Sequence, residues 1–196
     1  MRSDWVTPWW QAACLPDKWD VCGVSVPPLS VWHTFALENI GNAYLRGGAV
    51  DQDSAASLLL FAQHDYAGGR KLLLMPYYRA KMIARMYRRL RKIPLEDIHA
   101  ACGEYVEECM RSASRFNADG GKPCAVPYQW HIVAKLSEGN PAGIDAAWNM
   151  PYSTARCLYD AGAEAGGDGS VMSAASQEME DNWEDYEPKM AEVGLS

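Results

Sequence analysis

The sequence has no apolar run long enough to cross a membrane. A membrane-spanning helix needs roughly 18 or more consecutive apolar residues, and the strongest run here, residues 58–62, is followed at once by Gln63, His64 and Asp65. The first residues, MRSDWVTPWWQ, hold an aspartate and a proline where a signal peptide requires an apolar stretch. We therefore expect a soluble protein that is made in the cytoplasm and has no membrane partner.

Motifs of catalysis and cofactor binding are also missing. The sequence contains no Gly-x-Ser-x-Gly nucleophile elbow, no phosphate loop and no dinucleotide fingerprint after a strand. The glycine-rich run at 166–169 follows a predicted helix, so it indicates the end of that helix. We expect no catalytic residue, no cofactor and no enzymatic activity. An enzyme with an unrecognised site is kept as an alternative, because missing motifs do not settle function.

Histidine is scarce, with 4 residues in the chain of 196. Glu96 and His99 have the spacing that di-iron helical bundles use, but such bundles need the pair twice. Ser30, Phe61 and Tyr128 stand three residues before the other histidines. We therefore expect no metal site at this pair.

The six cysteines do not form a zinc-binding pattern. Zinc ligands usually lie about two to five residues apart, whereas Cys14 and Cys22 are eight apart and Cys102 and Cys109 are seven apart. The chain is also too long and too apolar to need disulfides for its stability. Reduced, mostly buried thiols and no stoichiometric metal are expected.

Apolar residues recur at three and four positions along most of the chain, and the alternation typical of strands is nearly absent. Ser30 stands where the cap of the first helix is expected, and either Asp51 or Asp53 can cap the second. Pro94 and Pro151 stand at the starts of later helices. The predicted helices are 30–46, 54–63, a helix from 71 or 75 to 91, 94–115, 128–136 and 151–165, with a break at 66–69 and a small turn at 144–150.

These features predict an all-α protein with one compact domain of six or seven helices at residues 29–170. An apolar fraction of 48% is enough to fill one core. An extended Trp-rich arm at 1–28 and an acidic tail at 171–196 are expected to flank this domain. The predicted core residues lie on apolar helical faces or at a proline-started turn: Trp32, Phe35, Leu59, Phe61, Met82, Met86 and Trp148.

Tryptophan and proline are concentrated at the start of the chain. Trp5, Trp9, Trp10 and Trp19 alternate with prolines at positions 8, 16, 27 and 28. This segment is too broken by proline for a helix and too aromatic for a solvated tail. We expect the arm to dock, either on the protein's own helices or on a partner.

Charge is distributed unevenly along the chain. No acid occurs between Asp65 and Glu96, and this stretch holds half of the 18 basic residues: Arg70, Lys71, Arg79, Lys81, Arg85, Arg88, Arg89, Arg91 and Lys92. One predicted helix is therefore strongly cationic, and its expected buried stripe is Met75, Tyr78, Met82, Met86 and Leu90. The C-terminal tail carries the opposite charge, and the net charge of -7 argues against non-specific nucleic-acid binding by the whole molecule.

Opposite charges in one chain indicate pairing, either within a subunit or head to tail between subunits. The alternative is two solvated faces without mutual contact, because exposed ion pairs are weak. Nucleic-acid binding by residues 79–92 is a further alternative, although no groove-reading motif accompanies them. The residues that we predict to bind a partner are Trp5, Trp9, Trp10, Arg79, Arg85, Arg88, Arg89 and Trp148.

Two segments carry a family resemblance. Residues 29–45, LSVWHTFALENIGNAYL, form a predicted helix that leads into a turn of small residues, and residues 147–156, AWNMPYSTAR, contain a Trp-x-Met-Pro turn. Both resemble parts of small helical proteins encoded near the tail genes of tailed bacteriophages, including tail assembly chaperones. The resemblance implies a non-enzymatic protein that acts in phage morphogenesis, either as a chaperone for tail assembly or as a structural component of the virion.

The same resemblance implies partners and location. Other phage structural or assembly proteins are the expected partners, in a homo- or hetero-oligomer. The expected location is the host cytoplasm during assembly, or the virion. No catalytic residue is implied, and chaperone and structural component remain open alternatives.

Overall fold

The computed structural model describes residues 15–111, 126–138 and 143–165, so the expected acidic tail and the first part of the expected arm lie outside the described residues. The mostly helical architecture is confirmed, and no helix in the described ranges combines the length and the apolarity that a membrane span requires. The elements are β1 (Trp19–Val21), β2 (Val24–Val26), α2 (Val31–Asn39), α3 (Ala43–Arg46), α4 (Gln52–Ala62), α5 (Tyr66–Leu74), α6 (Pro76–Leu90), α7 (Leu95–Met110), α8 (Tyr128–Leu136), α9 (Gly143–Asn149) and α10 (Tyr152–Ala165).

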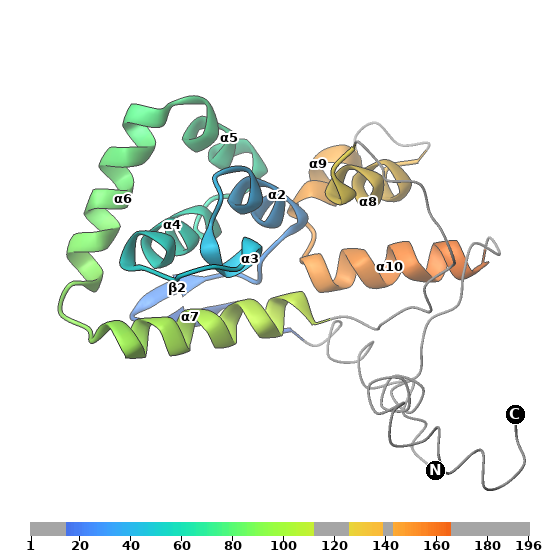
Figure 1. The fold of residues 1–196 in the computed structure, drawn as a ribbon. Helices are drawn as coiled ribbons and strands as arrows, with labels where there is room; N and C mark the ends of the chain where they lie inside the picture. The colour runs from blue at the N-terminus through green and yellow to red at the C-terminus, as the bar shows by residue number, and fades with distance from the viewer. Residues whose placement is uncertain (1–14, 112–125, 139–142, 166–196) are drawn as a thin grey trace, which may run out of the picture.

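Helix α4 forms the centre of the fold. Every side chain from residue 55 to residue 62 is buried. The helix begins at the predicted cap Asp51, whose Oδ1 accepts a hydrogen bond of 2.7 Å from the Ser54 N–H. Because α4 has no polar side in this stretch, it needs neighbours on several sides. Figure 1 shows it among α2, α3, α6 and α7, and it contacts all four.

A β-hairpin occupies residues 19–26, where we expected part of an extended arm. The two strands are antiparallel, with Val21 opposite Val24, and both valines are buried. Cys22 and Gly23 form the turn with φ angles of 56° and 73°, which are the left-handed conformations that a two-residue hairpin turn needs. The expected arm is therefore wrong for these residues. A three-residue strand gives too short an alternation to stand out against helical spacing.

Helix α5 occupies the region where residues 66–69 predicted a break. Asp65 caps this helix, and its Oδ1 accepts a hydrogen bond of 2.7 Å from the Gly68 N–H. Gly69 lies against the indole of Trp32, and a Cβ at position 69 would stand 2.3 Å from Trp32 Nε1. The predicted break is wrong because this glycine allows close packing between α5 and α2 rather than a turn.

The helix predicted at 30–46 is divided into α2 and α3. Gly41 has a φ of 73°, and Asn42 then caps α3 by accepting a hydrogen bond of 3.1 Å from the Tyr44 N–H. The Asn42 amide also donates a 2.8 Å hydrogen bond to Ser57 Oγ on α4. With this division, with α5, and with α9 in place of the predicted turn, the described residues hold nine helices instead of six or seven.

The starts of α2 and α10 are joined to each other. The Val31 N–H donates to the Met150 carbonyl at 3.0 Å, and the Tyr152 N–H donates to the Leu29 carbonyl at 2.8 Å. Ser30 caps α2 as predicted. This short antiparallel bridge fixes α8, α9 and α10, which lie together on one side of the molecule, to the helices around α4 (Figure 1).

His33 connects the same junction to the end of α4. Its Nδ1 accepts a 2.9 Å hydrogen bond from the Ser30 N–H, and its Nε2 donates to the His64 carbonyl at 2.7 Å. These two contacts require the neutral ring with the proton on Nε2. Burial lowers the pKa of His33 to about 4.

Most of the predicted core is confirmed. Phe35 and Met82 are half-buried and pack against the core rather than inside it, and Phe35 lines an open pocket. The five expected core residues that are buried are Trp32, Leu59, Phe61, Met86 and Trp148.

Replacing Leu59 with Ala should lower the free energy of unfolding by about 2–5 kcal/mol, because the change removes buried apolar surface and leaves a cavity. Leu158 on α10 is exposed, so Leu158→Ala is a matched control that should change stability by no more than about 0.5 kcal/mol. Urea denaturation followed by circular dichroism measures both. Equal effects of the two substitutions would contradict the central position of α4.

The neutral state of His33 should make stability depend on pH. An unfolded histidine binds a proton near pH 6.5, whereas the buried ring does so only near pH 4. As the pH falls through this window, only the unfolded chain takes up the proton, so stability should fall by about 1.4 kcal/mol per pH unit from this group. His33→Gln should be less stable at pH 7 and should lose this part of the slope. Identical slopes for both proteins in urea titrations between pH 7 and pH 4 would refute this role.

Candidate functional site

Helix α6 is the element that carries the predicted basic residues. It starts with Pro76 in its first turn, which is the position where proline is tolerated. Met86 and Leu90 are buried, and α6 packs along α4. Met75 and Tyr78 are exposed, which corrects their expected burial, because the start of α6 projects beyond the core.

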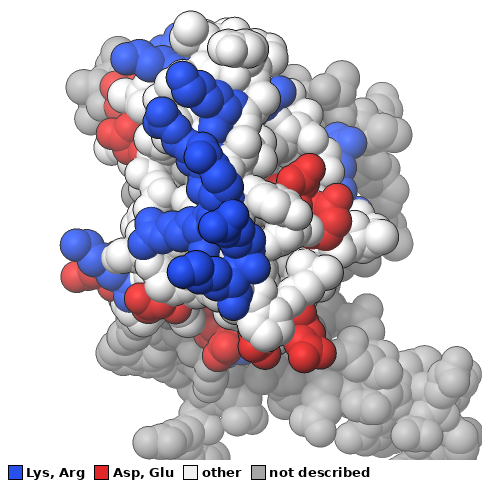
Figure 2. Space-filling model, turned by 90° about the vertical axis from the view of Figure 1, so that its left-hand side faces the viewer, with Lys and Arg blue, Asp and Glu red and all other residues white. Residues whose placement is uncertain are grey.

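The cations of α6 gather on its outer side. Lys81, Arg85 and Arg88 are exposed and recur at intervals of four and three, so they follow one side of the helix, and the exposed Lys92 comes just after its end. We call this surface, together with Arg89 and Arg91, the α6 basic face. Figure 2 shows Lys and Arg side chains as a continuous band on this side of the molecule, with acidic side chains only beside it.

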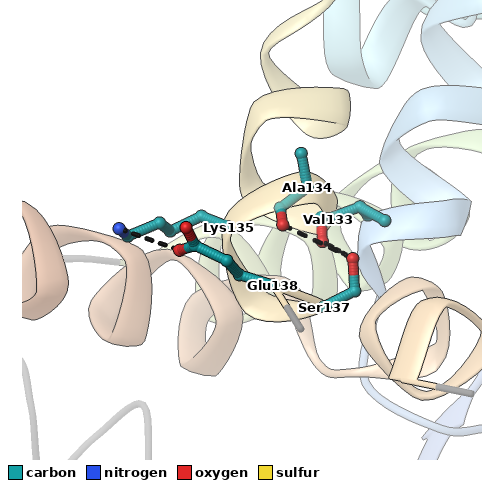
Figure 3. Close-up of polar contacts among 5 residues, drawn as sticks. All are labelled: Val133, Ala134, Lys135, Ser137 and Glu138. Carbon is teal, nitrogen blue, oxygen red and sulfur yellow. Dashed lines mark hydrogen bonds and ion pairs between the residues drawn. The ribbon is translucent and has the colours of Figure 1, made fainter. Parts of the chain in front are cut away.

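Three cations outside the α6 basic face have acidic partners in the described residues: Arg111, Lys135 and Arg156. Lys135 at the end of α8 pairs with Glu138 at 3.1 Å, beside the Ser137 hydroxyl that donates to the Val133 carbonyl at 2.6 Å (Figure 3). Arg111 pairs with Glu108 at 2.6 Å. Among the same described residues, no carboxylate forms an ion pair with a side chain of the α6 basic face. Its positive charge is therefore not compensated locally.

Several of the predicted arginines also have structural contacts. Arg89 Nη2 donates a 2.6 Å hydrogen bond to the Gly23 carbonyl in the hairpin turn. Arg79 is half-buried, and its Nη1 donates to the Leu72 carbonyl at 3.3 Å. Arg85 has only a weak 3.6 Å contact with the Met82 sulfur, and Arg88 contacts the Ala84 carbonyl of its own helix. Arg85 and Arg88 are thus the arginines that are most available to a partner.

Three exposed tyrosines accompany these cations. The sequence analysis placed Tyr78 in the buried stripe and did not identify Tyr77 or Tyr87. Tyr77 is 86% exposed, and Tyr78 and Tyr87 are both 41% exposed. The signal in the sequence for Tyr77 and Tyr78 was their position directly after Pro76, at the start of α6. Tyrosine and arginine are both enriched at protein interfaces.

Trp148, which we predicted to bind a partner, is only 1% exposed. Its ring stacks on Tyr66 at a centroid distance of 5.6 Å and meets the Trp130 ring edge to face at 5.0 Å. The prediction of an exposed binding residue is therefore corrected: Trp148 is part of the core, and its apolar ring is covered by neighbouring helices. The other predicted indoles, Trp5, Trp9 and Trp10, lie outside the described residues.

Two buried cysteines of α7 have raised pKa values. Burial raises the pKa of Cys102 to about 12 and that of Cys109 to about 11, whereas a nucleophilic cysteine needs a lowered pKa. Within the described ranges, no three His, Cys, Asp or Glu side chains are grouped for metal binding. His99 instead packs edge to face against Tyr44.

The chain matches no protein family model, no curated protein and no solved structure. Residues 29–45 and 147–156 meet at the bridge between Ser30 and Pro151. This bridge is a backbone junction next to the core, so these two segments supply structure rather than an exposed site. Among the described residues, the α6 basic face is a polar surface that is open for binding.

The different contacts of Arg89 and Arg85 predict different effects on stability. Arg89→Ala removes a charged hydrogen bond to the hairpin turn and should lower the free energy of unfolding by about 1 kcal/mol. Arg85→Ala changes the same charge on the same helix, but should alter stability by less than about 0.5 kcal/mol. Thermal unfolding followed by circular dichroism compares the two. A larger loss for Arg85→Ala than for Arg89→Ala would contradict this assignment.

Proposed function

We propose that this chain is a non-enzymatic binding protein that docks an acidic protein surface on the α6 basic face during the assembly of a tailed bacteriophage. The uncompensated positive charge of α6 is the observation that carries the proposal. The resemblance of residues 29–45 and 147–156 to phage tail-region proteins supports the setting. A tail assembly chaperone and a structural virion component both fit this description.

The charge of the α6 basic face supports a docking role because it is concentrated and open. Arg85 and Arg88 project from a rigid helix of 15 residues, about 22 Å long. Such a face accelerates encounter with an acidic partner and fixes its register, while apolar contacts beside it supply most of the affinity. Exposed Tyr87 lies among the same cations and offers a contact of this kind.

An acidic protein fits this face better than a long nucleic acid. The cations occupy one helix, and acidic side chains lie beside the band on the same side of the molecule (Figure 2). The net charge of the chain is -7, so a polyanion that extends beyond α6 would be repelled by the rest of the surface.

Reversing the charge of the α6 basic face should abolish binding to phage tail proteins. Full-length wild type and the Arg85→Glu/Arg88→Glu variant are used as affinity baits in extracts where particles assemble, and captured proteins are quantified by mass spectrometry. The control, Lys18→Glu/Lys135→Glu, changes net charge equally at exposed sites away from α6. We expect wild type and control to enrich the same tail protein. The α6 variant should enrich it at least tenfold less, and a higher salt concentration should reduce capture by wild type in the same way.

Two outcomes would contradict the proposal: no phage structural protein is enriched, or the α6 variant enriches it as well as wild type does. Mass spectrometry of purified particles then separates the two roles. A structural component is present in fixed copy number, whereas a chaperone is absent from particles and present only in the extract.

Nucleic-acid binding is the second candidate, and the exposed tyrosines on α6 favour it. Tyr77, Tyr78 and Tyr87 could stack on bases while the neighbouring cations contact phosphates. Fluorescence anisotropy with a single-stranded and a duplex oligonucleotide tests this function. An affinity that falls steeply between about 50 and 200 mM salt, and that is lost in Arg85→Glu/Arg88→Glu, would establish it in place of protein docking.

A further inference from the structure

Five aromatic side chains from four helices form a cluster at the junction of α2, α5, α8 and α9. The rings of Trp32 and Phe35 on α2 contact the central Trp148 ring at centroid distances of 6.3 and 5.5 Å. Tyr66 on α5 stacks on the same indole, and Trp130 on α8 meets it edge to face. We call these five side chains the aromatic cluster.

The aromatic cluster encloses a pocket that is open to the surface. The pocket has a volume of about 200 Å³ and is completed on the α5 side by Arg70, Leu73 and Leu74. Leu74 is 74% exposed and Trp130 is 43% exposed, so apolar side chains form the opening as well as the floor. Large apolar side chains at an open pocket are typical of a binding site.

The size and the chemistry of the pocket select one kind of guest. Its volume is below the roughly 300 Å³ at which small-molecule sites begin, so it suits a single large side chain. The Arg70 guanidinium already lies 5.5 Å from the centroid of the Tyr66 ring, and would repel a second cation. An uncharged aromatic ring gains edge-to-face contacts with the cluster instead.

The chain itself contains such side chains in residues 1–14, which lie outside the described residues. Residues 1–14 hold Trp5, Trp9 and Trp10, and their only charged residues are Arg2 and Asp4. A segment that is nearly neutral and rich in indoles matches an apolar aromatic pocket. Indoles in such a segment gain by burial at an interface.

The position of the first described residues favours the pocket of another subunit. Leu15 leads into β1, which packs on α7, whereas the pocket lies between α5 and the α8–α9 pair, beyond α2 (Figure 1). Trp9 is six residues and Trp5 ten residues from Leu15, so even a fully extended segment reaches at most about 20 Å and about 35 Å from Leu15, respectively. A second copy of the chain can present the segment to the pocket directly.

We propose that the aromatic pocket binds an indole of residues 5–10 from a second copy of this chain. The contact joins two different surfaces, so it is heterologous and links subunits head to tail. It does not depend on the α6 basic face or on a phage partner, and it gives the chain a self-assembly site in addition to its docking surface.

Photo-crosslinking in the full-length protein tests this contact. Benzoylphenylalanine replaces Trp130, which is partly exposed at the opening, and ¹⁴N- and ¹⁵N-labelled proteins are mixed before irradiation. We expect the pocket peptide to be linked to the tryptic peptide 3–18 of the other isotope. The same probe at Leu158, which is exposed on α10, is the control and should not link to that peptide.

Self-association provides the second measurement. Analytical ultracentrifugation should show at least a tenfold weaker association for Trp5→Ala/Trp9→Ala/Trp10→Ala and for Trp130→Ala, with unchanged helix content by circular dichroism. Leu158→Ala should associate like wild type. Arg85→Glu/Arg88→Glu should retain the crosslink, which separates this contact from the proposed α6 function.

Three results would overturn the proposal. These are a monomeric wild-type protein at its highest soluble concentration, crosslinks from position 130 to other regions of the chain, and crosslinks only between peptides of the same isotope. The last result would assign the indole to the pocket of its own subunit. If Trp130→Ala loses helix content, self-association is measured with Leu73→Glu in its place. This substitution puts a charge on the pocket wall and leaves the aromatic cluster unchanged.

Discussion

The burial of α4 determines where the other helices must lie. Eight consecutive residues of this helix are excluded from water, and a stretch that is apolar on all sides is stable only when it is enclosed. Helix α6 supplies part of that enclosure through Met86 and Leu90. Once these side chains face α4, helical geometry directs Lys81, Arg85 and Arg88 to the opposite side. The packing of α6 against α4 therefore determines where the positive charge of α6 lies.

Local sequence signals were sufficient for most helix boundaries. Ser30 caps α2 as predicted, Asp51 is the one of the two predicted candidates that caps α4, and Pro76 lies in the first turn of α6. These contacts join residues within about one turn, so their effect can be recognised from spacing alone. The resulting helices position the basic face, and the cations on it could also be predicted, because exposure of a charged side chain needs no tertiary information.

Features that depend on contacts between distant residues could not be predicted. Gly69 resembles a helix breaker in the sequence, but its role is set by the indole of Trp32, which lies 37 positions earlier. The sequence predicted Trp148 both as a core residue and as a partner-binding residue, and only the four other rings around it decide in favour of the core. The pocket beside it exists only because α2, α5, α8 and α9 converge, so no local pattern indicates it.

The two proposed binding surfaces, the α6 basic face and the aromatic pocket, would act through different interactions. Charge acts over about 10 Å at moderate salt and changes mainly the rate of encounter, whereas burial of an indole acts only on contact and changes mainly the rate of dissociation. The pocket includes Arg70 but no side chain of the α6 basic face, so substitutions can alter one surface and leave the other unchanged. Salt should therefore weaken docking on the α6 basic face and have little effect on an indole bound in the pocket.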